Sequence, residues 1–338
     1  MWKSFQSNWQ CVIILLATSV ITLTEIMHAP LSTGKISSTK DSLWVAPSLY
    51  YDDVSGEERE LISYGQQLIA NTSRYLGPNG TVAHISNGMN CQNCHLNAGK
   101  KNWGNNYSGV YSTYPRYRDR SGTIETIYKR VSDCLERSLN GTTLDSNSRE
   151  FKAIYTYIKW IGKDVKKDVK PMGSGIPKLP FMQRAADAAK GKIVYVSQCS
   201  SCHGANGEGA VNTNGFGYIY PPLWGQGSYN VGAGLFRISN FAGYVKSNMP
   251  FEQASHQNPK LSTEEAWDVA AFVNSQPRPQ KDFAKDWPDI SKKPFDHPFG
   301  PYTDGFDENQ HKYGPYAPIL LKREEMAKNN STLSPLKK

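Results

Sequence analysis

The chain has 338 residues and a formal net charge of +8, and 38% of its residues are hydrophobic. At about 150 residues per domain this length predicts two domains, and the 28 glycines and 20 prolines favour loop-rich domains over long helical bundles. The positive charge would permit nucleic-acid binding, but no basic helix or recognised motif accompanies it, so we expect no nucleic-acid partner and consider small anions or an acidic redox protein instead.

The N-terminus has the pattern of a secretory signal. Lys3 precedes an apolar run over residues 11–23, which is short for a membrane span. Residues 1–29 are therefore predicted to be a signal peptide. Because residues 27–29 match a cleavage site poorly, an uncleaved anchor is the alternative. An irregular lead-in is expected over residues 30–55.

Residues 56–73 have helical spacing of apolar side chains and are predicted to form the first helix. A C-x-x-C-H sequence follows at residues 91–95 and recurs at residues 199–203. This is the attachment sequence of c-type haem, in which two thiols bond to the vinyl groups and the histidine binds the iron. A zinc half-site is the alternative for either copy. The predicted cofactor-binding residues are Cys91, Cys94, His95, Cys199, Cys202 and His203.

Two such sequences predict two covalently attached c-type haems. Bacterial c-type haem is attached outside the cytoplasm, so the motifs and the signal both predict a periplasmic protein.

The rest of the first domain is predicted as a loop and two helices. A tyrosine- and glycine-rich loop is expected over residues 103–117. A second helix should begin near Ser121, because apolar residues then recur at helical intervals, and end at residues 140–141 (Asn-Gly). A third helix over residues 148–163 would complete an N-terminal cytochrome c domain at residues 56–170.

Residues 171–181 are rich in proline and glycine and are predicted to be a linker. The second domain, residues 182–276, repeats the plan, with a helix over residues 182–197 and a terminal helix over residues 263–275. Residues 277–338 show no sustained period and are predicted to be an extended tail that ends in a short basic helix or frayed end. The predicted fold class is mainly α, with two cytochrome c-type haem domains in tandem and a long irregular C-terminal extension.

The iron of a histidine-bound haem has one further axial position, whose ligand sets the redox potential. In the second domain Met249 lies in a predicted loop, is followed by proline, and is our candidate; its alternative role is packing. Lys246 and His256 are weaker candidates, and His84 is expected to be an ordinary loop histidine. Met172, in the linker, is expected to be a packing residue.

One cysteine needs a separate explanation. Of six cysteines, four belong to the haem motifs and Cys11 to the signal, which leaves Cys134 unpaired in an oxidising compartment. It shares a helix face with Arg130 and Ser138. A thiolate is a soft iron ligand that lowers the haem potential, and cationic neighbours favour the thiolate. A buried core cysteine, an intermolecular disulfide and an incidental free thiol are open alternatives.

Residues 130–141, RVSDCLERSLNG, resemble the cysteine-ligand segment of dihaem thiosulfate dehydrogenases. These are periplasmic, tetrathionate-forming cytochromes, related in their catalytic half to cytochromes that load thiosulfate onto a carrier protein. The resemblance covers roughly residues 56–276, with both haem motifs and the Met-Pro sequence in order. It implies axial ligands His95 and Cys134 at a catalytic haem, His203 and Met249 at an electron-exit haem, and anion-binding residues Arg120, Arg130 and Ser138 beside the catalytic Cys134.

The implied activity joins two thiosulfates into tetrathionate and releases two electrons to a soluble cytochrome or another periplasmic acceptor. As a hypothesis, the Cys134 sulfur takes up the first thiosulfate and is released when the second attacks. Some members carry a lysine directly before the axial methionine; Asn248 stands there in this chain, so a Lys/Met ligand switch is not expected. The alternatives are tetrathionate reduction as the main direction, a plain electron-transfer cytochrome, a dihaem peroxidase and a carrier-loading subunit.

Overall fold

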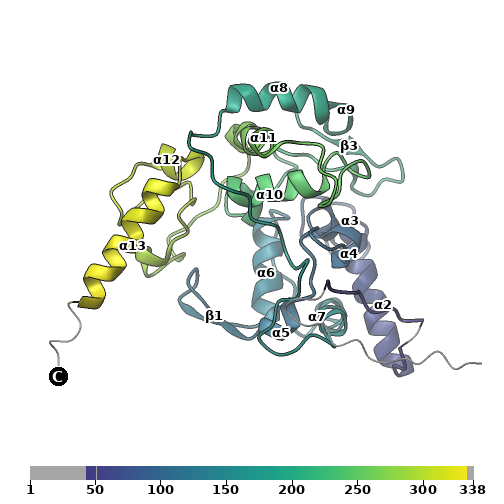
Figure 1. Cartoon of the computed structure of the whole chain (residues 1–338). Helices are drawn as coiled ribbons and strands as arrows, with labels where there is room; N and C mark the ends of the chain where they lie inside the picture. The colour runs from purple at the N-terminus through teal and green to yellow at the C-terminus, as the bar shows by residue number, and fades with distance from the viewer. Residues whose placement is uncertain (1–42, 51, 333–338) are drawn as a thin grey trace, which may run out of the picture. The chain divides into compact units, whose positions relative to one another are not determined.

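The computed structural model describes residues 43–50 and 52–332. The predicted signal peptide with Cys11, residues 30–42 and 51 of the lead-in, and the last six residues of the tail lie outside the described residues. Two groups of helices each surround a hydrophobic core, and a C-terminal segment follows them (Figure 1). Within the described part, no helix is both long and apolar enough to cross a membrane.

The first helical group contains seven helical elements and a small hairpin among the described residues. The elements are α2 (Gly56–Ala70), α3 (Thr72–Leu76), η1 (Cys91–Asn93), α4 (Leu96–Gly99), α5 (Val110–Thr113), β1 (Arg116–Arg118), β2 (Thr123–Glu125), α6 (Ile127–Arg137) and α7 (Arg149–Ile161). The helix predicted over residues 56–73 is divided at Asn71 into α2 and α3. The third predicted helix is α7, which Ser148 caps by accepting a hydrogen bond from the Phe151 amide.

The second predicted helix begins later than expected. Residues 123–125 pair antiparallel with residues 116–118, so the chain forms a hairpin where the sequence indicated a loop and the start of a helix. Ile124 matched the helical spacing by coincidence, because its side chain is exposed on β2. The helix itself, α6, begins at Ile127, where Thr126 caps it by accepting from the Lys129 amide.

The second helical group repeats the plan of the first. Its elements are α8 (Ala188–Gln198), α9 (Ser200–His203), β3 (Ala210–Val211), β4 (Tyr218–Tyr220), η2 (Gly234–Phe236), α10 (Ile238–Asn248) and α11 (Thr263–Ser275). The helix predicted to start at Met182 starts at Ala188, where Asp187 accepts hydrogen bonds from the first turn. Helix α10 was not predicted. It is buried on nearly all sides, and Arg237 at its N-cap makes no side-chain capping hydrogen bond, so no capping residue marks its start in the sequence.

A glycine in the first helix of each group allows a close helix crossing. A Cβ added at Gly65 of α2 would lie 2.1 Å from the Ala153 carbonyl oxygen of α7. A Cβ added at Gly191 of α8 would lie 1.8 Å from the Asp268 carbonyl oxygen of α11. In both groups a glycine therefore lets the first helix pack directly against the backbone of the last helix.

The two groups are in direct contact, since all described residues belong to one compact unit. The Tyr244 hydroxyl of α10 donates to the Asn93 carbonyl at 2.8 Å, and the Asn248 amide donates to the Trp103 carbonyl at 3.0 Å. Asn230 donates to the Glu136 carbonyl at 2.9 Å. The domain boundaries read from the sequence stay predictions.

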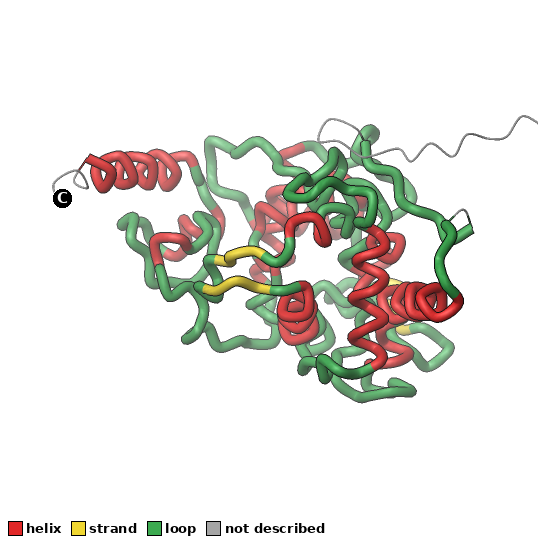
Figure 2. The backbone as a smooth tube through the Cα atoms, turned by 90° about the horizontal axis from the view of Figure 1, so that it is seen from below, coloured by secondary structure: helices red, strands yellow, loops and turns green. Residues whose placement is uncertain are grey.

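The C-terminal segment (residues 277–332) is irregular as far as residue 307, apart from one short turn of helix. Its elements are η3 (Ile290–Lys292), α12 (Glu308–Tyr313) and α13 (Ala317–Thr332). Helix α13 has 16 residues, so it is longer than the short end helix predicted. Figure 2 shows the β1–β2 hairpin extending towards this segment.

Candidate functional site

Both haem-motif histidines are held in the orientation that iron ligation requires. The Nδ1 atom of His95 lies 2.6 Å from the Asn105 carbonyl oxygen, and Nδ1 of His203 lies 2.8 Å from the Pro221 carbonyl oxygen. A carbonyl can only accept, so each Nδ1 carries the proton and each Nε2 is left as the ligand atom. Burial lowers the pKa of His95 to about 4 and also lowers the pKa of His203, so both imidazoles are neutral at pH 7.

The second motif adjoins a cavity of about 330 Å³. Its lining includes Cys199, Cys202 and His203 on one side and Met249 on another, with apolar side chains between them. Met249 directly follows α10 as its C-cap, rather than lying within a free loop as predicted. These residues fit a covalently attached haem, because the thiols, a neutral imidazole and a thioether surround one apolar space.

The weaker ligand candidates have other partners. Lys246 Nζ donates to the Leu261 carbonyl at 2.9 Å, and the His256 ring stacks on Trp103 at 4.2 Å between centroids. Asn248 is fully buried, and its amide donates to the Trp103 and Tyr244 carbonyls. None of these three residues is among the described residues that line the second cavity. Met172, expected to pack, is 45% exposed.

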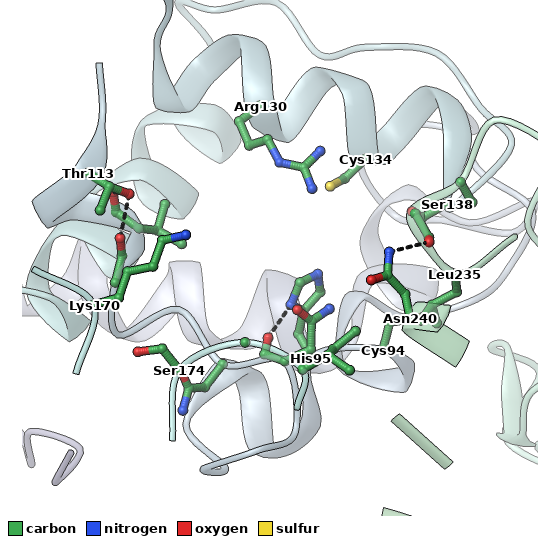
Figure 3. Close-up of a pocket in the computed structure, with 18 of the residues that line it drawn as sticks. Cys94, His95, Thr113, Arg130, Cys134, Ser138, Lys170, Ser174, Leu235 and Asn240 are labelled. Atoms are coloured by element: carbon green, nitrogen blue, oxygen red, sulfur yellow. Dashed lines mark hydrogen bonds between the residues drawn. The ribbon is translucent and has the colours of Figure 1, made fainter. Parts of the chain in front are cut away.

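The first motif adjoins a larger cavity of about 430 Å³. Besides Cys94 and His95 of the motif, its lining includes Arg130, Cys134 and Ser138, as predicted. Arg130 and Cys134 of α6 and its C-cap Ser138 are four residues apart and therefore share one face. Figure 3 shows Cys134 and Arg130 across the cavity from His95. A smaller cavity of about 150 Å³ shares Cys94, His95 and Cys134 with it and adds apolar residues of α6 and α7.

The surroundings of Cys134 suit a ligating or reactive sulfur. The side chain is half-buried and forms no disulfide with another described cysteine. The negative charge of a Cys134 thiolate raises the pKa of Arg130 above its usual value, against the opposing effect of burial. The guanidinium is therefore close enough to stabilise the thiolate. A haem attached at Cys91 and Cys94 and bound by His95 would have Cys134 on its other face, so these residues also fit the cofactor.

Four cationic residues of the first cavity were missed in the sequence. They are Arg116, Arg118, Lys170 and Lys178. Together with Arg130 they line the cavity, and no carboxylate is among its described lining residues. The alternation of a strand places Arg116 and Arg118 on one face of β1, with Tyr117 exposed on the other. Burial and the charges of Arg116 and Arg118 lower the pKa of Lys170. The Arg-Tyr-Arg alternation was the signal available in the sequence.

Arg120 is not among the described residues that line the cavity. It lies in the turn between β1 and β2, and its guanidinium carbon is 5.2 Å from the centre of the Trp287 ring. Burial, with the nearby charges of Arg137 and Arg130, lowers the pKa of Arg120 to about 10. Arg120 thus adds positive charge near Arg130 and Arg137 of α6. Its predicted anion-binding role stays a prediction, and so do the roles of the other site residues.

The two cavities adjoin each other. Cys94, Tyr229 and Leu235 line both of them. The Tyr229 hydroxyl donates to Asn274 of α11 at 2.8 Å, which fixes this shared wall to the second helical group. Any group bound in one cavity is therefore close to a group bound in the other.

Two families match the chain, one in each helical group. The SoxA/TsdA cytochrome c domain family matches residues 81–166, and the cytochrome c family matches residues 188–277. The solved thiosulfate dehydrogenase (TsdBA) from Marichromatium purpuratum, in its as-isolated form, is 30% identical with a TM-score of 0.64. The match covers 71% of this chain and 50% of that one. The predicted fold class is confirmed, and the two C-x-x-C-H sequences attach two c-type haems.

Curated relatives show the same likeness. A thiosulfate dehydrogenase of Psychrobacter arcticus is 39% identical over 206 residues, which are 61% of each chain. One of Allochromatium vinosum is 37% identical over 58% of this chain and 72% of that protein. One of Stutzerimonas stutzeri is 37% identical over 221 residues, 65% of this chain and 68% of that protein. The chain belongs to the thiosulfate dehydrogenase family.

Proposed function

We propose that this chain is a periplasmic oxidoreductase that joins two thiosulfates into tetrathionate and passes two electrons to an external acceptor. The observation that carries the proposal is the position of Cys134, which faces His95 across a cavity lined by cations (Figure 3). The names of the similar proteins and the signal-type N-terminus agree with the substrate and the location.

The obstacle to this reaction is electrostatic, and the cavity lining addresses it. Two dianions 4 Å apart repel each other by about 4 kcal/mol in water and about 16 kcal/mol at an effective dielectric constant of 20. A site that excludes water must therefore supply fixed positive charge. Arg130 presents a forked donor suited to sulfonate oxygens, and Arg116, Lys170 and Lys178 add charge around the same space. Arg118 also lines it but is paired with the buried Glu125 at 3.7 Å.

Cys134 supplies the sulfur on which the two substrates meet. A Cys134 thiolate bonds to the outer sulfur of the first thiosulfate, giving Cys–S–S–SO₃⁻ and releasing two electrons. The outer sulfur of the second thiosulfate then attacks the sulfur attached to Cys134. Tetrathionate leaves and the thiolate is restored, so charge and atoms balance in both steps. Arg130 stabilises the thiolate, and Ser138 at the end of the same helix face can donate a hydrogen bond to a sulfonate oxygen.

When bound, the haems accept the two electrons, one each. Cys134 and Met249 set the direction of transfer, because a thiolate ligand lowers a haem potential relative to a thioether. The shared wall of Cys94, Tyr229 and Leu235 keeps the path between the sites short. A soluble cytochrome or another periplasmic acceptor would take the electrons from the second site.

The test is thiosulfate-dependent reduction of the purified dihaem protein, with tetrathionate identified by mass spectrometry. Replacing Cys134 by glycine should leave both haems attached, since neither attachment motif is changed, and should reduce turnover below detection. Ser132→Gly is the matched control, because it introduces the same helix-weakening residue into α6 without removing the sulfur. A C134G protein that forms tetrathionate at the wild-type rate would show that the chain acts only as an electron carrier or by another route.

The reverse reaction uses the same residues and is tested in the same preparation. Tetrathionate supplied with a reduced acceptor should be converted to thiosulfate if the path is reversible. The periplasmic location is tested by fractionating cells that express the full chain.

A further inference from the structure

The C-terminal segment lies beyond the cytochrome c match, which ends at residue 277. It follows the second helical group in sequence, yet it contacts the hairpin and helix of the first group that carry Arg120 and Cys134 (Figures 1 and 2). No role was predicted for this segment from its sequence. Two of its contacts with the first group, made by the neighbouring residues Asp286 and Trp287, carry the inference. Lys281 adds an ion pair to Glu136 of α6 at 3.5 Å.

The first contact fixes the end of α6. Arg137, three residues after Cys134, pairs with Asp286 through two short contacts: Nη1 to Oδ2 at 2.8 Å and Nη2 to Oδ1 at 2.9 Å. Each side chain is 9% exposed. This buried ion pair contains one hydrogen bond, from Nη2 to Oδ1, and removing one partner leaves the other charge buried and uncompensated.

The second contact fixes the hairpin turn. The Trp287 amide donates to the Arg120 carbonyl at 2.7 Å, and the Arg120 guanidinium lies over the Trp287 ring, which is 4% exposed. Pro288 packs against the same turn, where a Cβ added at Gly122 would lie 2.5 Å from Pro288 Cγ. The hairpin has only three residues in each strand. Because so short a ribbon is marginally stable alone, this packing determines where Arg120 sits.

We propose that Trp287 and Asp286 are positioning residues of the first haem site, Trp287 holding the Arg120 guanidinium and Asp286 holding the helix end beside Cys134. The inference rests on the proposed function and on the anion-binding role that the family resemblance implies for Arg120. Arg120 is not among the described residues that line the cavity, so it would act on the substrate through its charge beside Arg130. Asp286 neutralises Arg137, so the excess positive charge near α6 comes from Arg120 and Arg130. Their charges interact, because Arg130 contributes to the lowered pKa of Arg120.

Trp287→Leu tests the first role, because it keeps apolar bulk and removes the aromatic face. Binding of sulfate, a dianion that is not oxidised here, is measured by calorimetry on the dihaem protein, beside the KM for thiosulfate. We expect W287L to raise both constants about fivefold to thirtyfold, the range between an exposed and a desolvated cation–π contact. The kcat and the electron paramagnetic resonance signal of the first haem should not change. Trp287→Phe should recover affinity to within about twofold of wild type.

Phe295→Leu is the matched control, an aromatic of the same segment that packs on Phe181 and Tyr316. A double-mutant cycle decides whether Trp287 acts through Arg120. W287L should add nothing to the effect of Arg120→Gln. Additive effects, an effect of F295L as large as that of W287L, or an R120Q protein with unchanged sulfate binding would each overturn the inference. None of these outcomes depends on turnover by Cys134, so the proposed function fails or stands separately.

Asp286→Asn tests the second role by leaving Arg137 charged and uncompensated. The added positive charge should favour the reduced state and raise the midpoint potential of the first haem. Asp282→Asn, an exposed neighbour that caps the Ala284 amide, should not change the potential. Combining D286N with Arg137→Gln should restore the wild-type potential. If D286N and D282N give the same potential, Asp286 has no positioning role at this site.

Discussion

The two haem sites have the same attachment chemistry and differ in the other residues that line their cavities. Each histidine donates from Nδ1 to a backbone carbonyl. The first cavity has five Lys and Arg residues and no carboxylate among its described lining residues. The described lining of the second has no Lys or Arg, one glutamate and Met249. The attachment motif therefore fixes the cofactor, and under the proposed function the remaining lining residues decide between anion chemistry and electron transfer.

The first test of this comparison replaces Met249, the proposed iron ligand in the second cavity. Met249→His should lower the midpoint potential of the second haem by roughly 0.1–0.2 V, because histidine replaces a ligand that raises haem potentials. At 59 mV per tenfold change, this shifts the electron distribution between the haems by about fiftyfold or more. A spectroscopic redox titration measures it.

The control for this change is Met172→His, at the half-exposed linker methionine. It should leave both potentials unchanged, because Met172 lines neither cavity in the part of the chain that the structure describes. An unchanged second potential in M249H would mean that Met249 is not an iron ligand.

The asymmetry between the sites was only partly readable from the sequence. The helix face of Arg130, Cys134 and Ser138 was predicted because its residues are local, with a spacing of four on α6. Lys178 and Arg116 were not found because a predicted linker and a β-hairpin bring them together from distant parts of the chain. The carbonyl of Asn105 that orients His95 has no side-chain signal at all.

The fold shows the same division between local and tertiary information. Helices whose start is marked by a capping serine, such as α7 and α11, were predicted to within a few residues. Helix α10 was missed because Arg237 at its N-cap makes no side-chain capping hydrogen bond, so no such residue marks its start. The contact of Asp286 with Arg137 joins residues 149 positions apart, and no local pattern indicates it.

The second way to test the comparison is to remove charge from the first site. Arg130→Gln should raise the KM for thiosulfate about tenfold to a hundredfold, the cost of losing a hydrogen bond between charged groups. Arg130→Lys should recover only part of this loss, because lysine keeps the charge and lacks the fork. Initial rates at low thiosulfate measure both variants.

Arg149→Gln is the matched control, since Arg149 lies over Tyr64 and away from the cavity. Its KM should equal that of wild type. If R130Q and R149Q have the same KM, the cations of the first cavity do not hold the substrate, and the two sites differ less in function than in composition.

The smallest expected effect concerns the pH dependence of stability. It depends on a histidine of the C-terminal segment that lies near the charge of Arg120. His297 is 4% exposed and packs on Trp287. Burial, helped by the charges of Lys293, Arg120 and Arg237, lowers its pKa to about 3. An unfolded histidine titrates near 6.5, so between these values the unfolded state binds the extra proton. The stabilising contribution of neutral His297 is therefore complete above pH 6.5 and is lost progressively as the pH falls towards 3.

Between pH 7 and pH 5 this linkage should lower the free energy of unfolding by about 2 kcal/mol, and His297→Gln should abolish that part of the loss. Urea unfolding of the dihaem protein at the two pH values measures it. His84→Gln, at an exposed loop histidine, should retain the wild-type dependence. If H297Q and H84Q lose the same stability on acidification, His297 is not held neutral by its buried position against Trp287.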